Sequence, residues 1–408
     1  MTTDFEVIIV GSGPAGSSTA LHLAALDPAM ARRTLILEKA VHPRVKLCAG
    51  GITGKGLRVL DRLGLPLGVD FLPMTGVEIR TGQRRRYTAC PGLGVTIQRP
   101  AFDGWLAHKA AERGAHLHEG EGFTVAEVEA DRVVVTTAKA RYTARALVAA
   151  DGAASPVRRA LGWPPPRHRA RLLILDTERG PHDDALRDDT LYLDFAPMGE
   201  GIHGYVWDFP TRINGRPFVN RGIYDRGDPE SAKGSLKEPL RRALAARGVD
   251  LDACHLQGHL ERELDPAGPF ARPRVLLAGE AAGIDPALGE GIAQALAYGD
   301  LAARELLRAA RTGDWSFTGY RRRLLRSRLG QELLGTRHLA ARLYGPRGDR
   351  YLDLFLASAR INRLGARFLA GRLHPALLSL AVLPSLAMMP FVGGRVQGRS
   401  GSSLRFCI

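Results

Sequence analysis

The sequence contains no hydrophobic run long enough to cross a membrane. Its longest apolar stretch, residues 377–392, is interrupted by Pro384 and Pro390, whereas a membrane helix needs about 20 consecutive apolar residues. A strand-like pattern starts already at Phe5, which leaves no room for a cleaved signal peptide. We therefore expect a cytoplasmic protein and leave open a peripheral attachment to the inner membrane.

Cysteine is scarce and is not spaced as metal ligands are. The 408 residues include only four cysteines, Cys48, Cys90, Cys254 and Cys407, and no two of them form a CxxC pair. This pattern favours a reducing compartment and argues against a zinc site. We predict that the protein holds no metal.

Acidic residues are outnumbered, and the imbalance is local. The chain has 42 acidic and 57 basic residues, and the segment 301–372 alone holds 16 arginines against 5 acidic residues. Aromatic residues do not alternate with these arginines, as stacking on nucleic acid would require, so nucleic acid is not an expected partner. Two interpretations stay open: attraction to an anionic membrane surface or ligand, or a solvated helical face.

What is present is a repeated strand-and-helix pattern. Residues 6–10 read as a strand, 11–16 as a glycine-rich turn, 17–25 as a helix and 34–38 as a second strand. Two later apolar runs resemble further buried parallel strands, at 145–150 and 274–278, and a long helical pattern covers 291–310. Strand alternation within 76–97 and 171–261 indicates a second, antiparallel sheet, and from about 312 the pattern is helical.

The glycine-rich turn has the spacing and the context of a dinucleotide-binding loop. Gly11, Gly13 and Gly16 satisfy G-x-G-x-x-G between a strand and a helix, where the helix N-terminus provides N–H donors for a pyrophosphate. Glu38 closes the second strand, where a carboxylate can bind the two hydroxyls of a ribose. We therefore predict a Rossmann-type nucleotide site.

Two later strand ends favour FAD over NAD. Asp151-Gly152 and Gly279-Glu280 each place an acid and small residues after a strand, as a long dinucleotide lying across the sheet requires. A helix start near Gly291 and Ile292 suits the electron-rich edge of a flavin ring. Each motif alone could be an ordinary strand-to-loop turn.

These elements resemble the glycine-rich, DG and GD motifs of the aromatic-hydroxylase-like flavoproteins, and the segment 99–106 resembles the arginine segment of that superfamily. Within it, K-x-C-x-G-G at 46–51 and Y-x-W-x-F-P at 205–210 resemble the geranylgeranyl reductase family. The resemblance implies an FAD site, and together with the glycine-rich turn it gives the expected cofactor contacts as Gly11, Gly13, Ala15, Gly16, Glu38, Lys39, Cys48, Ala49, Gly51, Arg99, Asp151, Gly152, Gly279, Glu280, Gly291 and Ile292. It gives the expected substrate contacts as Tyr205, Trp207, Phe209 and Pro210.

The aromatic motif also has a physical rationale. On a strand, Tyr205, Trp207 and Phe209 point to one face, where they would form an apolar wall for a prenyl chain or a planar ring. The alternative is ordinary packing between domains. Cys48 is a candidate proton donor or redox partner near the flavin, or else a small residue that fills a tight loop.

The expected fold class is α/β: a Rossmann-type FAD-binding domain, an inserted antiparallel-sheet substrate domain and a C-terminal helical region. The expected FAD-binding segments are 1–72, 99–167 and 269–311, the substrate-domain segments are 73–98 and 168–268, and the helical, basic region is 312–408.

The resemblance implies an FAD-dependent reductase that saturates the alkene bonds of a geranylgeranyl-type chain. No second glycine-rich motif lies between a strand and a helix, since residues 393–398 do not fit one. We therefore expect NADPH or another transient donor, or an electron-donor protein. Two alternatives stay open: a flavin monooxygenase or halogenase, and a membrane-peripheral electron-transfer flavoprotein. Halogenases of the superfamily carry W-x-W-x-I-P where this chain has Y-x-W-x-F-P.

Overall fold

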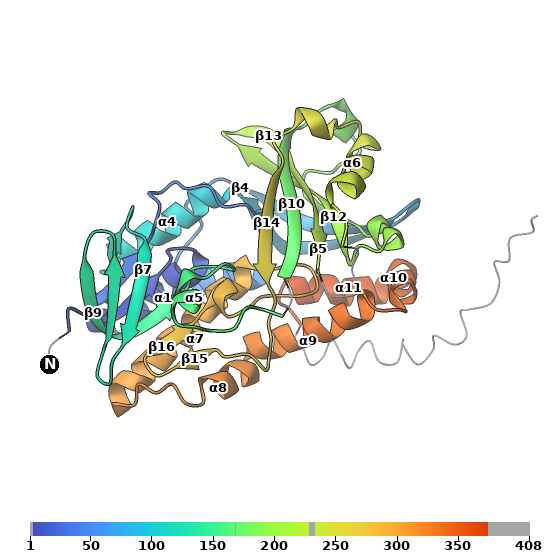
Figure 1. Cartoon of the computed structure of the whole chain (residues 1–408). Coiled ribbons are helices and arrows are strands. Elements are labelled where there is room, and N and C mark those ends of the chain that lie inside the picture. The colour runs from blue at the N-terminus through green and yellow to red at the C-terminus, as the bar shows by residue number, and fades with distance from the viewer. Residues whose placement is uncertain (1–2, 168, 228–232, 374–408) are drawn as a thin grey trace, which may run out of the picture.

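The computed structural model describes residues 3–167, 169–227 and 233–373. Within them, two eight-stranded sheets lie at the two ends of the molecule, and helices cover both (Figure 1). The expectations about residues 377–392 and 393–398 lie outside the described residues.

The first sheet has the parallel arrangement that the sequence predicted for its Rossmann-type domain. Its main path runs β15-β16-β9-β1-β2-β6, in which β1 pairs in parallel with both β2 and β9. Val7, Ile8 and Ile9 on β1 are fully buried, in a core shared with helix α1 and with the hairpin of β7 and β8. The strands are β1 (Phe5–Val10), β2 (Thr34–Leu37), β6 (His116–His118), β7 (Phe123–Val128), β8 (Val133–Thr137), β9 (Arg141–Ala149), β15 (Ala271–Arg272) and β16 (Val275–Leu277).

The helices around this sheet come from three separate stretches of the chain. Helix α1, from the first stretch, makes its most extensive helix contact with α7, from the last stretch. This contact brings the two stretches together in space. The helices are α1 (Pro14–Leu26), α2 (Pro28–Ala31), α3 (Gly54–Arg62), α4 (Arg99–Glu112), α5 (Pro156–Ala160) and α7 (Ile292–Thr312).

The second sheet runs β14-β10-β13-β12-β11-β4-β5-β3. One face packs on α6 (Lys237–Ala245) through a core that includes Val206 and Leu240. The opposite face contributes Tyr205 and Trp207 to a core with the C-terminal helices. The strands are β3 (Gly51–Thr53), β4 (Phe71–Thr81), β5 (Arg84–Ile97), β10 (Arg169–Glu178), β11 (Thr190–Asp194), β12 (Gly204–Ile213), β13 (Arg216–Asp225) and β14 (Gln257–Arg262).

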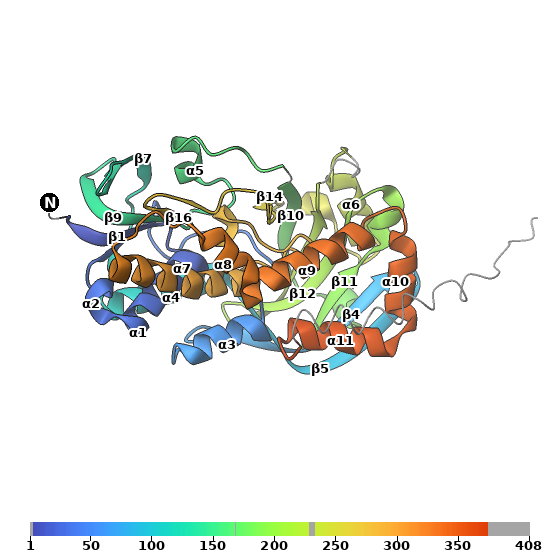
Figure 2. The same ribbon diagram turned by 90° about the horizontal axis from the view of Figure 1, so that it is seen from below.

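The C-terminal helices link the two halves. Figure 2 shows α9 and α11 lying under the second sheet, with α10 at its far end. The helices are α8 (Tyr320–Arg326), α9 (Arg328–Leu343), α10 (Gly348–Ala357) and α11 (Ala359–Leu369). Short 3₁₀ turns cover Pro181–Asp183, Ala196–Glu200, Leu251–Ala253 and Gly279–Ala281. No helix in the described part of the chain is long and apolar enough to cross a membrane.

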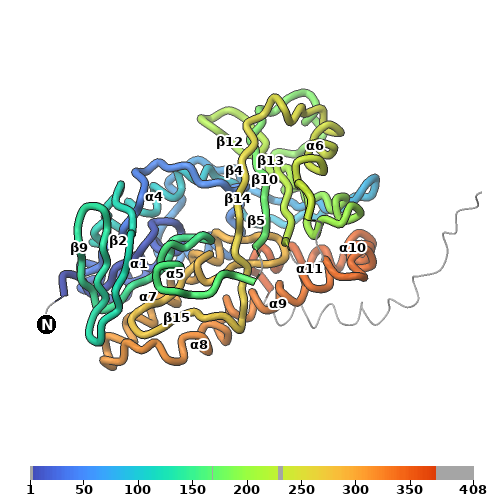
Figure 3. Tube along the Cα trace, viewed as in Figure 1, coloured from blue at the N-terminus to red at the C-terminus, as the bar shows by residue number. Residues whose placement is uncertain are grey.

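The structure differs from the sequence expectation in two details. Strand β3 lies within the segment 1–72 that was assigned to the FAD-binding domain, yet it pairs with β5 of the second sheet. The second sheet is also not wholly antiparallel, because β11 pairs with β4 in parallel. Alternation identifies a half-buried strand but carries no information on the direction of its neighbour, which explains the second difference. The tube in Figure 3 shows the chain leaving the second sheet along β14 and returning to the first at β15.

Candidate FAD and substrate site

The glycine-rich loop packs so tightly against the sheet that Gly11 and Gly16 have no space for a side chain, whereas Gly13 on its outer side does. A Cβ atom at Gly11, where φ is +98°, would lie 2.5 Å from the carbonyl oxygen of Ala150, and a Cβ at Gly16 would overlap the carbonyl of Gly11. Gly13 is the N-cap of α1, and a Cβ there would meet only the Arg44 guanidinium, at 3.6 Å. The loop therefore leaves room beside the first turn of α1, where free N–H groups attract a phosphate.

Glu38 lies at the end of β2, beside this loop. Its carboxylate accepts hydrogen bonds from the backbone N–H and the hydroxyl of Ser12, at 3.1 and 2.8 Å. Burial raises the pKa of Glu38, but the Arg44 charge and the Ser12 hydrogen bonds outweigh it, so the pKa is lowered. An ionised carboxylate at this place suits a ribose diol. Lys39, the next residue, is exposed and packs against the loop at Gly122.

Arg44 is the cofactor-site candidate that the sequence did not reveal. Its side chain is 15% exposed and lies 3.3 Å from the carboxylates of both Glu38 and Asp103. The contact with Glu38 is made by Nε, which is ion-paired at this distance but forms no hydrogen bond within the described residues. No local motif marks this arginine, and only the fold brings it over Gly13, where it can neutralise a pyrophosphate.

The DG and GE motifs converge on the same loop. A Cβ at Gly279, where φ is +61°, would lie 2.7 Å from the Cβ of Ala15, and a Cβ at Gly152 would lie 3.5 Å from a Glu280 oxygen. The Asp151 carboxylate holds the start of α5, because it accepts hydrogen bonds from the Ser155 hydroxyl at 2.7 Å and the backbone N–H of Val157 at 2.8 Å. The structure thus brings the three motifs together, although Asp151 is already occupied by α5.

Glu280 belongs to a small charged group. The Lys46 ammonium lies 3.5 Å from Glu280 and 2.7 Å from the His259 ring, and His259 lies 3.8 Å from Glu280. Burial raises the pKa of Glu280, but Lys46 and His259 outweigh it and hold the pKa at about 2. Glu280 is therefore a carboxylate at neutral pH and can accept a hydrogen bond from a hydroxyl.

Arg99 connects α4 to the K-x-C loop. Its guanidinium makes two hydrogen bonds to the buried Asp103 carboxylate, both of 2.8 Å. Burial lowers the pKa of Arg99, but interactions with Asp103 and the Cys48 side chain raise it overall. The Cys48 sulfur also accepts the backbone N–H of Gly50 at 3.4 Å. The thiol is thus held within the loop on two sides.

A cavity of about 960 Å³, counting its open mouth, lies against the second sheet, between its aromatic face, the K-x-C loop and the start of α7. Of the expected cofactor contacts, it is lined by Cys48, Ala49, Gly51, Gly291 and Ile292. Of the expected substrate contacts, it is lined by Tyr205, Trp207 and Phe209. The remaining wall is mostly aliphatic: Val77, Leu93, Val95, Leu172, Ile174, Leu191 and Leu193.

The aromatic side chains of β12 form a continuous surface. The ring centroids of Tyr205 and Trp207 are 6.2 Å apart, and those of Trp207 and Phe209 are 6.5 Å apart. Tyr205 donates to the carbonyl of Leu288 at 2.5 Å, and the Trp207 indole donates to the Asn220 side chain at 2.9 Å. Pro210 does not line the cavity, and its carbonyl accepts the Thr96 hydroxyl at 2.6 Å.

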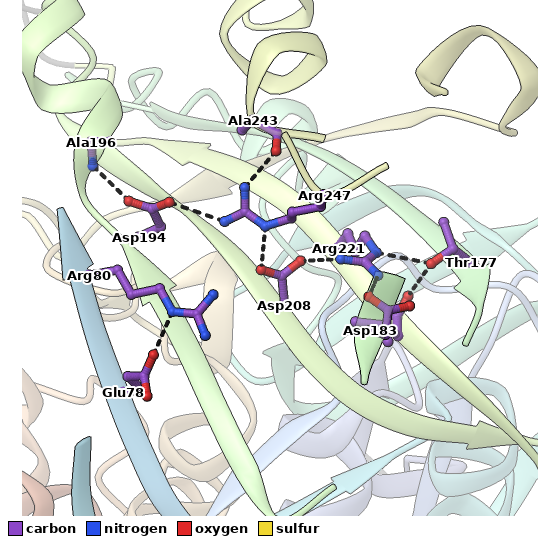
Figure 4. A network of polar contacts seen from close by, with 11 residues as sticks. Glu78, Arg80, Thr177, Asp183, Asp194, Ala196, Asp208, Arg221, Ala243 and Arg247 are labelled. Atoms are coloured by element: carbon purple, nitrogen blue, oxygen red, sulfur yellow. Dashed lines mark hydrogen bonds and ion pairs between the residues drawn. The ribbon is translucent and has the colours of Figure 1, made fainter. Parts of the chain in front are cut away.

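A buried charged network holds β12 from the opposite face (Figure 4). Arg221 is fully buried and donates to Asp208 at 2.5 Å and also to Asp183. Arg247 donates to the second oxygen of Asp208 at 2.8 Å and to Asp194 at 3.1 Å. Asp208 alternates with Trp207 along the strand, so this network fixes the strand that carries the aromatic wall.

Comparison with known proteins agrees with this geometry. A model of the FAD binding domain matches residues 4–303. The chain is 30% identical over 370 residues to a menaquinone reductase from Mycobacterium tuberculosis, covering 84% of this chain and 85% of the relative. It is 29% identical to a digeranylgeranylglycerophospholipid reductase from Methanopyrus kandleri, covering 77% and 79%. The chain belongs to the geranylgeranyl reductase family of FAD-dependent oxidoreductases.

A solved structure of the same fold comes from Thermoplasma acidophilum and is described as geranylgeranyl bacteriochlorophyll reductase-like. It superimposes with a TM-score of 0.72 at 22% identity and covers 95% of this chain and 97% of its own. In this family setting, the open Gly13 face, the Arg44 side chain and the Glu38 carboxylate fit the diphosphate and ribose of FAD. The cavity beside the K-x-C loop and the start of α7 fits its ring.

Proposed function

We propose that this FAD-dependent oxidoreductase saturates alkene bonds of a prenyl chain. The observation that carries the proposal is the apolar cavity, whose aromatic and aliphatic walls adjoin the K-x-C loop and the start of α7. Such walls bind a hydrocarbon chain by burial of apolar surface. The two compounds that the relatives are named for, a menaquinone and a digeranylgeranylglycerophospholipid, both carry prenyl chains.

FAD, when bound and reduced, supplies a hydride, and the side chains of the protein position the alkene of the prenyl substrate. Trp207 and Phe209 on the second sheet orient the prenyl chain. Cys48 and Ala49 of the K-x-C loop close the cavity on another side. The helix α7 begins at Ile292 and presents its free N–H groups to the same space, where they favour negative charge on the cofactor. Electrons reach the flavin from NADPH that docks transiently, or from a donor protein.

Mass spectrometry of lipids from a strain that lacks the gene tests the proposal. We expect a prenylated lipid to accumulate whose mass is lower than that of the wild-type lipid by multiples of two hydrogens, one pair for each double bond left unreduced. The purified enzyme should also form product under anaerobic conditions, without consuming oxygen. Oxygen uptake in proportion to product would instead support a monooxygenase or halogenase. An unchanged lipid profile would contradict the proposal.

A further inference from the structure

Glu261 is a carboxyl group in the cavity for which the site described above has no role. It lies on β14 and lines the same cavity as Cys48 and Trp207. Its Oε2 is inaccessible to solvent and has no hydrogen-bond partner within the described residues. A Cβ at Gly289 would lie 2.9 Å from this oxygen, so the carboxyl abuts the turn that leads into α7.

The surroundings of Glu261 offer little compensation for a negative charge. The groups that act on its charge are Glu280, Lys46, Asp285 and Glu263, three acids and one cation. That cation is already engaged, because Lys46 pairs with Glu280 and contacts the ring of His259. An unpaired carboxylate in such a place is costly, whereas a neutral carboxylic acid is not.

The neighbouring phenols do not supply the missing hydrogen bond. Tyr205 donates its hydroxyl proton to the carbonyl of Leu288 at 2.5 Å, and Tyr224 donates to the carbonyl of Pro286 at 3.4 Å. Burial, reinforced by Glu280, raises the pKa of Glu261 well above its usual range. The raised pKa favours the neutral form of the group, which carries a proton that it can release.

Two other acidic side chains line the cavity, Glu290 and Cys48. Glu290 already pairs with Lys55 and accepts the Thr53 hydroxyl at 2.5 Å. Cys48 is held within the K-x-C loop. Its sulfur accepts a hydrogen bond from the backbone N–H of Gly50 and lies against the Arg99 guanidinium. Both side chains are therefore engaged by neighbours, whereas Oε2 of Glu261 has no hydrogen-bond partner within the described residues.

We infer that Glu261 is the general acid that delivers a proton to the alkene; this assignment rests on the proposed reductase function. One alkene carbon takes a hydride from the reduced flavin, and the other takes the proton as the Glu261 O–H bond breaks. The two electrons of the π bond form the new C–H bond to the proton. The hydride brings the electron pair of the second new C–H bond. Glu261 becomes a carboxylate, the flavin is oxidised, and a solvent proton restores the acid.

The test compares Glu261→Gln with Leu260→Gln in the FAD-loaded enzyme. Leu260 is the adjacent residue on β14, is 44% exposed and does not line the cavity. Gln is a close match in shape for a neutral acid, so Glu261→Gln should fold and keep FAD. If it does not keep FAD, Glu261→Met removes the same proton without adding a polar group.

Each enzyme is reduced with dithionite without oxygen and mixed with geranylgeranyl phospholipid, and the oxidation of the flavin is followed. We expect Glu261→Gln to be slower than wild type by about 100-fold or more, the usual scale for a lost general acid, and Leu260→Gln to stay within a few-fold. Equal rates in wild type and Glu261→Gln would overturn the assignment. If no prenyl lipid oxidises the reduced flavin of the wild-type enzyme, the proposed function itself is contradicted.

An infrared difference spectrum gives a readout that does not depend on turnover. The oxidised wild-type enzyme at pH 7, minus Glu261→Gln, should show the carbonyl stretch of a protonated carboxylic acid. This band should disappear in wild type as the pH is raised above the pKa of Glu261. A carboxylate signal at pH 7 in place of that band would overturn the assignment.

Discussion

At the scale of single residues, Gly13 gives a direct test of the phosphate cradle. Its backbone is compatible with any residue, since φ is −66° at the N-cap of α1, and aspartate is a favoured N-cap. Gly13→Asp should therefore fold, yet its carboxylate would repel a pyrophosphate. We expect the purified variant to be colourless, whereas wild type is yellow with non-covalent FAD. Gly180→Asp is the control, because a Cβ at Gly180 meets no atom within 4 Å. A folded Gly13→Asp variant with full FAD would refute the cradle.

The acidic group at the start of α7 predicts a dependence of stability on pH. Glu290 pairs with Lys55 and accepts the Thr53 hydroxyl at 2.5 Å, while Lys55 is shared with Glu332 at 2.7 Å. Burial raises the pKa of Glu290 to about 7, because one lysine, which lowers it, cannot neutralise two carboxylates. The pKa of Lys55 is raised as well, since both carboxylates favour its charge over the opposing effect of burial.

The folded protein thus holds the Glu290 proton more tightly than the unfolded chain, whose pKa is near 4.5. This contribution is fully present below pH ~4.5 and is lost as the pH rises to ~7, with a total of up to about 3 kcal/mol. Urea unfolding at several pH values measures it. Glu290→Gln, which cannot ionise, should show a flatter decline over this range than wild type. The same slope in both proteins would show that Glu290 does not titrate there.

At the scale of elements, the two faces of β12 allow substrate contact and structural packing to be tested separately. Trp207 lies on the cavity face and Val206 on the face covered by α6. Trp207→Ala should raise KM or abolish turnover while the FAD content stays unchanged. Val206→Ala shortens a buried side chain of the same strand and should lower stability by about 1–3 kcal/mol without changing KM. Unaltered kinetics in Trp207→Ala, Tyr205→Ala and Phe209→Ala would show that β12 does not line the substrate site.

The elements that the sequence predicted are those with a local signal. Strand β1 was located because its apolar run ends at the glycine-rich turn, and β9 and β16 because their runs end at a glycine and an acid. Helix α7 was located because its helical pattern is long. The start of α1 was assigned three residues late, at Ser17, because the whole glycine motif was taken as the turn, although Pro14 is a residue that commonly begins a helix. The direction of β11 against β4 had no local signal at all.

The site residues follow the same rule. The glycines and the aromatic strand were proposed from their spacing, and their roles as FAD and substrate contacts stay predictions. By contrast, Arg44 reaches Asp103 across 59 positions in the sequence, and the Lys55–Glu290 pair spans 235. Glu261 was missed because a lone glutamate on a strand reads as an exposed residue, and only the packing of Gly289 shows that its oxygen is buried.

At the scale of the whole molecule, the arginine excess stays a prediction about a membrane surface. Helix α8 shows which arginines can be tested, because Arg321 donates to the carbonyl of Pro266 at 2.9 Å and Arg323 donates to Glu305 at 2.7 Å. Arg322 and Arg326 on the same helix are exposed. Reversal of these two charges leaves the structural contacts of α8 in place.

If the segment contacts a membrane, the protein should sediment with vesicles that contain anionic lipid and not with neutral ones. Arg322→Glu with Arg326→Glu should weaken binding, since each arginine near the surface contributes on the order of 1 kcal/mol. Salt should weaken it too, as the Debye length falls from ~10 Å at 0.1 M to ~3 Å at 1 M. No sedimentation with either kind of vesicle at low salt would support the solvated-face alternative.

The central claim is that reduced flavin in this cavity saturates a prenyl double bond. The most direct measurement is a single turnover without oxygen, in which dithionite-reduced enzyme is mixed with a geranylgeranyl lipid and both flavin and lipid are followed. The account predicts that the flavin is oxidised and that one lipid molecule per flavin gains the mass of two hydrogens. Flavin that stays reduced with every prenyl lipid, and is oxidised only after oxygen is admitted, would contradict it.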